Sequence, residues 1–464
     1  MSQFQAGVGR ADITPPVGIA HGNWSAQVHE RAEGIDLALW CTALAAKDAD
    51  TEVIIAEWDL LYPPGGEWLA EARRRITELT GVPGDRIRLS AVHTHAGPNI
   101  KKPWFAGGAE MVEPYVASLT DRLAGACLAA HQALRPARVA GGYGACAVNC
   151  NRRRPWKPDR LLLAPNPEGF SDHQVGVIRI DDVAGKPIAI LVNFAAHPTI
   201  LAWDNRLISS DYPGSVRRTV EGLTGATCLF LQGAAGNQNT MRDYSCKPED
   251  ARWVGRQIGL EAVRVAEFIE PQPTEMRIGK YVESSWTMGV AERAPTGQPD
   301  GRVACISRTV SVPMWKHDPP AEAEIKKVKD LEQRLADLRA GGAPVEQIRE
   351  ANMRVRRATL DLTVKTRRSK GTEIAMEFQA IRLGPTALVG IPVEPFAEIG
   401  AEVKAASPFA TTFFSGYTNG SEGYMAMPYA FDEGGYEVWM TPFAREAPGI
   451  TIASSLKLLH ALRD

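Results

Sequence analysis

The sequence predicts an α/β fold, a mixed β-sheet core with flanking helices. Two observations support this. Short apolar runs rich in β-branched or aromatic residues, such as 53–56, have the composition of buried strands. They alternate with segments such as 66–80, in which apolar residues recur every three or four positions, as in an amphipathic helix. Alternation of this kind favours a largely buried sheet.

The alternation can be followed along the chain. Strands are expected at 37–40, 53–56, 86–92, 188–194 and 226–232. Helices are expected at 66–80, 112–135, 213–223 and 250–268, the first ending before Gly81-Val82-Pro83. The stretches 15–34 and 143–173 show no regular period, and we expect them to be surface or active-site loops.

A different pattern appears at about 320–360. Apolar residues recur at helical spacing among Glu, Lys and Arg, and Gly341-Gly342-Ala343-Pro344 interrupts them, which predicts an amphipathic helical hairpin. The hairpin could be a lid, an arm that joins a homo-oligomer, or an insertion packed on its own chain. The last interpretation is favoured, and a homo-oligomer remains open.

Composition excludes several classes of protein. The 464 residues include 52 Lys and Arg and 54 Asp and Glu, a net charge of −2, which argues against a nucleic-acid partner. No apolar run approaches the ~20 residues that span a bilayer, so we expect no stable membrane insertion. Met1–Gln5 lacks a secretory signal pattern and the seven cysteines are scattered, so we expect a cytoplasmic protein.

Polar residues follow several of the predicted strands, where α/β sheets tend to bind ligands. His93 and His95 have the i, i+2 spacing that puts two side chains on one side of an extended segment. Two imidazoles on one face suit zinc, although a pair of ordinary loop histidines is the commoner case. His197 and Glu394 each follow another apolar strand, and a buried Glu394 would need a cation beside it.

Several motifs, in order, resemble the catalytic N-terminal domain of the neutral/alkaline non-lysosomal ceramidase family. They are the start Gly7–Pro16, His93-Thr94-His95, Asn151-Arg152, His197, Glu394, and Asn419–Tyr424 followed by Tyr436-Glu437. The resemblance covers essentially residues 1–464 as a single catalytic domain, with no counterpart of the family's C-terminal immunoglobulin-like domain.

The resemblance implies one zinc ion per chain and assigns residues to it. The metal ligands would be His93, His197, Glu394 and Tyr424. His95, Arg152 and Tyr436 would be the catalytic residues around it, in a site where zinc activates water. Arg153 and Arg154 are adjacent to Arg152, and the Asn-Arg match favours Arg152.

One segment departs from the family pattern. The ceramidases carry a catalytic serine in a Gly-Asp-Val-Ser-Pro-Asn type segment, whereas the matching stretch here is 233–239, Gly-Ala-Ala-Gly-Asn-Gln-Asn. A serine-dependent mechanism is therefore not expected. Gly236 and Asn237 could still bind substrate, or the turn could only connect a strand to a helix, which also needs glycine.

For other residues near the motifs, a purely structural role is favoured at least as much as a functional one. Trp104 and Trp203, with Trp156, could wall a substrate pocket or belong to the core. Asp59 could orient a ligand histidine and Asp211 could cap a helix, and a structural role is favoured for both.

The sequence thus predicts a zinc-dependent hydrolase that cleaves a linear or cyclic amide of a small molecule by metal-activated water. An esterase or lactonase with the same site is an alternative, as is a scaffold protein that kept the fold and lost the chemistry. A two-metal phosphoesterase is disfavoured because the expected cluster of Asp ligands is not visible.

Overall fold

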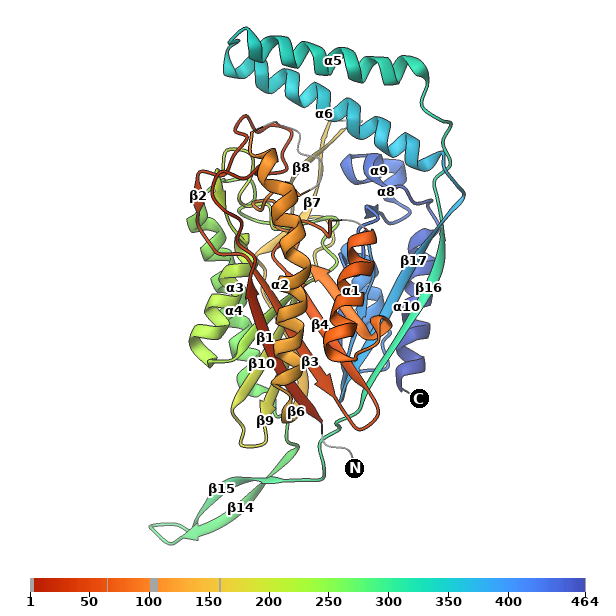
Figure 1. Ribbon diagram of the computed structural model, residues 1–464. Coiled ribbons are helices and arrows are strands. Elements are labelled where there is room, and N and C mark those ends of the chain that lie inside the picture. The colour runs from red at the N-terminus through yellow and green to blue at the C-terminus, as the bar shows by residue number, and fades with distance from the viewer. Residues whose placement is uncertain (1–3, 65, 101–106, 158–159, 464) are drawn as a thin grey trace.

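The computed structural model describes residues 4–64, 66–100, 107–157 and 160–463. It confirms the α/β class, with a mixed sheet at the centre and helices around it (Figure 1). The larger sheet has eight strands, in the spatial order β12 (Thr227–Gln232), β10 (Pro187–Phe194), β9 (Gln174–Asp182), β6 (Arg135–Ala145), β1 (Gln5–Asp12), β3 (Trp40–Lys47), β4 (Glu52–Trp58) and β5 (Ile87–Ala91).

A second sheet lies against the first. Its four strands are, in order, β16 (Val303–Pro313), β17 (Glu373–Leu383), β18 (Thr386–Gly390) and β20 (Thr411–Ser415). Most neighbours in the two sheets are antiparallel, but β4 and β5, β10 and β12, and β18 and β20 are parallel pairs. The strands of a parallel pair end at the same edge, so each pair carries two loops to one end of the molecule.

The core is built in four layers, which explains why the strands are apolar on both faces. In β4, Ile54 and Ala56 belong to a cluster with the helices, whereas Val53 and Ile55 pack toward the second sheet. The outer layer on the large sheet is formed by α1 (Gly66–Thr80), α2 (Val112–Gln132), α3 (Asp211–Thr224) and α4 (Pro248–Phe268). The second sheet is covered by α7 (Ala397–Ala405) and α10 (Ala447–Arg463).

Most predicted elements are confirmed within a few residues, and two predictions are wrong. The strand expected at 37–40 begins only at Trp40. The stretch 143–173 is not a loop, because it contains the end of β6 and the antiparallel strands β7 (Asn149–Lys157) and β8 (Arg160–Asn166). The sequence of β7 is dominated by Asn and Arg, so it lacks the alternating apolar period that identifies a strand. The stretch 15–34 is irregular, as expected.

The predicted helical hairpin is present and lies across one end of the molecule (Figure 1). It consists of α5 (Glu322–Ala340) and α6 (Val345–Arg368), so it is longer than the sequence pattern indicated. The short elements β2 (Gly34–Ile35), α8 (Ala430–Glu433) and α9 (Tyr436–Met440) lie towards the same end (Figure 1). The other short strands form small pairings: β11 (Leu207–Ile208) with β2, β13 (Gln238–Thr240) with β7, and β19 (Glu394–Pro395) with β21 (Tyr424–Met425).

A two-stranded hairpin projects from the opposite end, formed by β14 (Thr274–Val282) and β15 (Met288–Pro295) (Figure 1). In the part of the chain that the structure describes, the cysteines are free thiols, and none of the helices is both long and apolar enough to cross a bilayer.

Candidate metal centre

The polar residues singled out from the sequence come together where strands of both sheets end. His93 follows β5, His197 follows β10, and Glu394 follows β18. The edge strand β5 also contacts the segment that follows β20 of the second sheet, because Ser90 forms a β-bridge with Thr418. The site therefore lies at the junction of the two sheets, at the carboxyl ends of strands from each.

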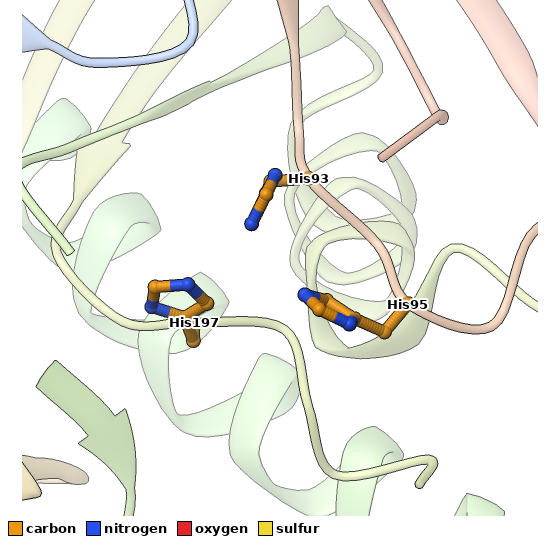
Figure 2. A group of neighbouring side chains, drawn as sticks. All are labelled: His93, His95 and His197. Atoms are coloured by element: carbon orange, nitrogen blue, oxygen red, sulfur yellow. The ribbon is translucent and has the colours of Figure 1, made fainter. Parts of the chain in front are cut away.

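Three imidazole rings lie around one small space (Figure 2). His93, His95 and His197 each offer a ring nitrogen, and these nitrogens all lie within 4.8 Å of one another. The ring centroid of His93 lies 5.0 Å from the ring centroid of His95 and 5.0 Å from that of His197. The three rings are therefore close enough to hold one metal ion between them.

Backbone carbonyls orient two of these rings. Nδ1 of His93 lies 2.6 Å from the Leu61 oxygen, and Nδ1 of His197 lies 2.6 Å from the Ala235 oxygen. A carbonyl only accepts, so each Nδ1 must be the protonated nitrogen and each Nε2 keeps its lone pair. This is how proteins hold the histidine ligands of zinc.

Glu394 and Tyr424 complete the group of donor atoms. Oε2 of Glu394 lies 3.3 Å from Nε2 of His197 and 3.6 Å from Nε2 of His93. The Tyr424 hydroxyl lies 3.4 Å from Nε2 of His197. The two residues are adjacent because β19 and β21 pair in parallel, with Glu394 opposite Tyr424.

This set of donors fits zinc. Imidazole nitrogens and a carboxylate oxygen are ligand types that zinc prefers, and the Tyr424 hydroxyl adds a further oxygen donor beside them. Burial lowers the pKa of His93, His95 and His197 well below the usual value, which keeps the imidazoles neutral, the form that binds metal.

His95 adds a third imidazole beside the proposed ligands. Both of its ring nitrogens are buried without a hydrogen-bond partner among the described residues, which is costly unless a ligand satisfies them. The geometry is therefore compatible with His95 as a metal ligand as well as with a role toward substrate.

An aromatic wall covers His95. The Trp24 ring lies 5.1 Å from the His95 ring and contacts Trp203 and Tyr244 edge-on. Trp203 in turn stacks on Tyr244 at 5.9 Å. Trp203 was a candidate from the sequence, but Trp24 and Tyr244 were not, because their role depends on loops that meet only in the fold.

Arg152 lies at the metal centre. Its Nε donates to Glu437 at 2.8 Å, and its Nη2 lies 3.2 Å from the Tyr424 hydroxyl. A third bond joins Nη1 to Asn239. A guanidinium has five N–H groups, so donors remain for a substrate oxygen.

The neighbouring arginines point elsewhere. Arg153 forms an ion pair with the other oxygen of Glu437 and also binds Glu433. Arg154 is exposed and donates to the Pro165 carbonyl. Of the three arginines, the structure thus brings Arg152 to Tyr424. The buried Glu437, which holds Arg152 and Arg153 together, had no assigned role in the sequence argument.

Tyr436 also reaches the site, from the first residue of α9. Its ring lies 5.6 Å from the Tyr424 ring, and burial raises the pKa of Tyr436 to about 12. The phenol therefore stays protonated and can donate a hydrogen bond.

The glycine turn at 233–239 packs against β19, the short strand that carries Glu394. The Gly236 N–H donates to the Pro395 carbonyl, and a Cβ at Gly236 would lie 2.6 Å from the Glu394 carbonyl oxygen. Asn237 is fully buried, and its amide binds the Ala397 N–H and the Glu398 carboxylate at the start of α7. This geometry does not support the prediction that Gly236 and Asn237 bind substrate.

The remaining candidates have structural positions. Asp59 accepts the Trp40 N–H and pairs with the buried Arg217, so it does not touch a ligand histidine. Asp211 begins α3 and accepts the N–H of Leu201 and of Tyr212. Trp156 is exposed, and Trp104 lies outside the described residues.

Tyr417 is a residue of the site that the sequence argument missed. Its ring lies 4.1 Å from that of His93, and its buried hydroxyl has no hydrogen-bond partner among the described residues. Tyr417 and His93 both have left-handed backbone, with φ of 54° and 70°, a conformation that costs energy for residues other than glycine. The Gly416–Met425 turn was visible in the sequence, but not its contact with His93.

Comparison with known proteins identifies relatives of the chain. No family model matches it. Neutral ceramidase of Pseudomonas aeruginosa is 23% identical over 456 residues, which cover 91% of this chain and 66% of that protein. Neutral ceramidase A of Dictyostelium discoideum is 30% identical over 140 residues, 28% of this chain and 19% of the relative. Neutral ceramidase of Oryza sativa subsp. japonica is 26% identical over 262 residues, 52% of this chain and 32% of the relative.

Solved structures show the same fold. The crystal structure of neutral ceramidase from Pseudomonas aeruginosa matches all of this chain and 75% of its own, with a TM-score of 0.70 at 19% identity. A ceramidase complexed with C2 matches with a TM-score of 0.69, also at 19% identity, and 76% of it is covered. The chain spans 66% or less of the length of the three curated relatives. By sequence and by fold, the chain is similar to the neutral ceramidases.

Proposed function

We propose that residues 1–464 form a zinc-dependent hydrolase domain that cleaves an amide bond, linear or cyclic, in a small molecule. The observation that carries the proposal is the convergence of His93, His197, Glu394 and Tyr424 on one buried point. The relatives are named ceramidases, and a ceramidase hydrolyses an amide, so the comparison points to the same bond type.

The four residues would hold one zinc ion per chain. Zinc in such a site activates water and polarises the carbonyl under attack. Because backbone carbonyls already orient the His93 and His197 rings, metal binding would require little rearrangement of the protein.

The other residues would act on the substrate. His95, whose two ring nitrogens have no hydrogen-bond partner among the described residues, can accept the proton that the attacking water releases and deliver it to the leaving amine. Arg152 places fixed positive charge beside Tyr424 and has donors left for the oxyanion. Tyr436, whose ring lies next to that of Tyr424, can also donate a hydrogen bond to the substrate. The wall of Trp24, Trp203 and Tyr244 would exclude water and favour an apolar or ring-containing group.

The first test is metal content and hydrolysis together. The purified chain should contain about one zinc, and chelation should abolish hydrolysis of an amide panel, with zinc restoring it. An ester and lactone panel measured in parallel separates the amidase from the esterase or lactonase. A chain that binds no zinc and hydrolyses none of these compounds would support the scaffold alternative.

The second test assigns the ligands. His93→Ala and His197→Ala should each lose zinc and activity, because one of four ligands is removed. His317→Ala is the matched control, since His317 is exposed on the surface. Full zinc occupancy in both site variants would refute the ligand assignment.

A further inference from the structure

A line of hydrogen bonds leads away from the metal centre and ends at Tyr244. Arg152 donates from Nη2 to the Tyr424 hydroxyl at 3.2 Å and from Nη1 to the side-chain oxygen of Asn239 at 3.2 Å. The side-chain nitrogen of Asn239 then donates to the Tyr244 hydroxyl at 2.7 Å. Asn239 is buried, whereas Tyr244 is only partly buried. The line therefore runs from the buried metal centre to a side chain that has solvent-accessible surface.

Arg152 fixes the direction of each hydrogen bond in this line. A guanidinium can only donate, so the Asn239 atom that faces it must be the amide oxygen. The amide nitrogen then faces Tyr244, and the Tyr244 oxygen must accept. The Tyr244 proton is therefore left to be donated elsewhere, and no side chain or carbonyl among the described residues takes it. Burial raises the pKa of Tyr244 above its usual value, so the phenol keeps this proton at neutral pH.

The backbone of Tyr244 is held in an unfavourable conformation. It is left-handed, with a φ of 63°, which costs energy for a residue other than glycine. The Tyr244 N–H donates to the Thr199 carbonyl at 3.2 Å, and the preceding Asp243 accepts from the hydroxyls of Thr199 and Thr240. Strain of this kind persists only where the surroundings fix it, and it is concentrated at functional sites.

Ring contacts place Tyr244 along the aromatic wall. Its ring lies 5.7 Å from that of Trp24 and 5.9 Å from that of Trp203. Trp24 in turn lies 5.1 Å from His95, so it links Tyr244 to the histidine group. A substrate group that reaches the Tyr244 hydroxyl therefore lies beside the wall, away from the point where the proposed metal ligands converge.

We infer that Tyr244 is a substrate-binding residue that donates its phenol proton to a second carbonyl oxygen of the substrate, one that flanks the scissile amide. Asn239 is the positioning residue that keeps this proton turned away from Arg152. The inference rests on the proposed function and narrows it to an amide that carries a further carbonyl group. A plain aliphatic amide would leave the phenol proton without an acceptor, and a polar group left unsatisfied in a site weakens binding.

The test compares two zinc-binding probes of equal chain length, N-acetylglycine hydroxamic acid and pentanohydroxamic acid, of which only the first has a second carbonyl. On the zinc-loaded full chain, the first probe should bind at least about fivefold more tightly, as measured by calorimetry. Tyr244→Phe keeps the ring and removes the donor, so it should abolish this preference. Zinc content and the affinity for pentanohydroxamic acid should stay within about twofold of the wild type. Tyr281→Phe, on the exposed β14–β15 hairpin, is the matched control and should keep the preference.

Asn239→Asp tests the direction of the line. A carboxylate can only accept, so it would take the Tyr244 proton for itself, and the preference should fall as it does in Tyr244→Phe. Combined with Tyr244→Phe, this change should cause no further loss of preference, because both changes remove the same hydrogen bond. A further loss in the double variant would show that Asn239 acts on binding by another route and would overturn its positioning role.

The outcomes separate this inference from the proposed function. Equal affinities for the two probes in a zinc-loaded wild-type chain, or a preference that survives Tyr244→Phe, would overturn the inference and leave the proposed function standing. A zinc-loaded chain that shows the preference but hydrolyses no amide would support Tyr244 as a binding residue and refute the proposed hydrolysis. A wild-type chain that binds no zinc would refute both, and metal analysis of the same sample identifies this case.

Discussion

Three adjacent arginines show how much one residue position matters at the metal centre. Arg152 is buried against Glu437, Asn239 and Tyr424, while Arg153 takes the other oxygen of Glu437 and Arg154 faces solvent. The side chains alternate and the ladder is irregular between Asn151 and Arg153, so neighbours in the chain are not neighbours in space. Residue type alone could not separate them.

Arg152→Ala should lower turnover about 10–100-fold and change KM much less, because it removes a group that holds Tyr424 and stabilises developing charge. Zinc content should stay close to that of the wild type, since all four proposed ligands remain. Steady-state kinetics and metal analysis measure these effects, with Arg154→Ala as the control, expected within about twofold. Equal losses in both variants would mean that Arg152 has no special role.

Gly236 gives a second prediction at this scale. Gly236→Ala should destabilise the fold by about 1–3 kcal/mol and weaken zinc binding, because the added Cβ would meet the backbone of Glu394 and Pro395. Thermal unfolding and zinc titration measure both effects. Gly222→Ala is the matched control: a Cβ there meets no atom within 4 Å in helix α3, so this change should stabilise the fold by up to about 1 kcal/mol. A tolerated Gly236→Ala would show that the turn can move.

Among the elements, the α5–α6 hairpin is packed on its own chain at the loop that carries Trp24. Asn352, on α6, donates to the carbonyls of Ser25 and Gln27. Arg349 pairs with Asp204, next to Trp203. The hairpin thus contacts two of the three loops that supply the aromatic wall, those of Trp24 and Trp203. It is an insertion packed on its own chain that also lies next to the site.

Asn352→Ala should therefore raise KM several-fold and leave zinc content unchanged, because the loop behind Trp24 loses its two hydrogen bonds. Unfolding should become easier by about 1–3 kcal/mol, since the carbonyl of the buried Gln27 and that of Ser25 lose their partner. Kinetics, metal analysis and protease sensitivity of the loop at 20–30 measure this. Gln347→Ala, on an exposed position of the same helix, is the control. Unchanged KM in both variants would mean that the hairpin does not position the wall.

At the scale of the whole molecule, the four-layer core buries ionisable groups that couple folding to pH. Glu57 and Asp59 lie fully buried between the large sheet and α3, paired with Arg217. Burial raises the pKa of Glu57 to about 8. It raises the pKa of Asp211 to about 6, although two backbone N–H groups favour the charged form of this residue. Glu57 and Asp211 therefore bind protons more tightly in the folded chain than in the unfolded chain.

Asp211 makes this measurable. Its folded pKa lies above the unfolded value of about 3.9, so its protonated form contributes stability below pH ~4, and that contribution is lost as pH rises toward 6. The free energy of unfolding of the wild type, minus that of Asp211→Asn, should fall by up to roughly 3 kcal/mol between pH 4 and 6 and stay constant above. Denaturant unfolding of metal-free protein measures it, with the exposed Asp50→Asn as background. A difference independent of pH would contradict the prediction.

The sequence by itself determined the elements and the chemistry available at the site. Local period and turn residues predicted the helices 66–80 and 250–268. The histidines and Glu394 stood out because each follows a predicted strand, whereas Tyr424 was assigned only through the resemblance to the neutral ceramidases. Strand β7 was missed because packing, not an apolar period, makes it extended.

Only the tertiary structure decided which of these residues meet. His93, His197, Glu394 and Tyr424 are far apart in the chain, and they converge because parallel strands of two different sheets end at one junction. The same long-range packing brings Arg152, and not Arg153 or Arg154, to Tyr424. It also places Trp24 against His95 and leaves β14–β15 exposed. Local sequence sets the backbone preference of a segment, but contacts between distant segments depend on how the layers pack, and no local pattern encodes that.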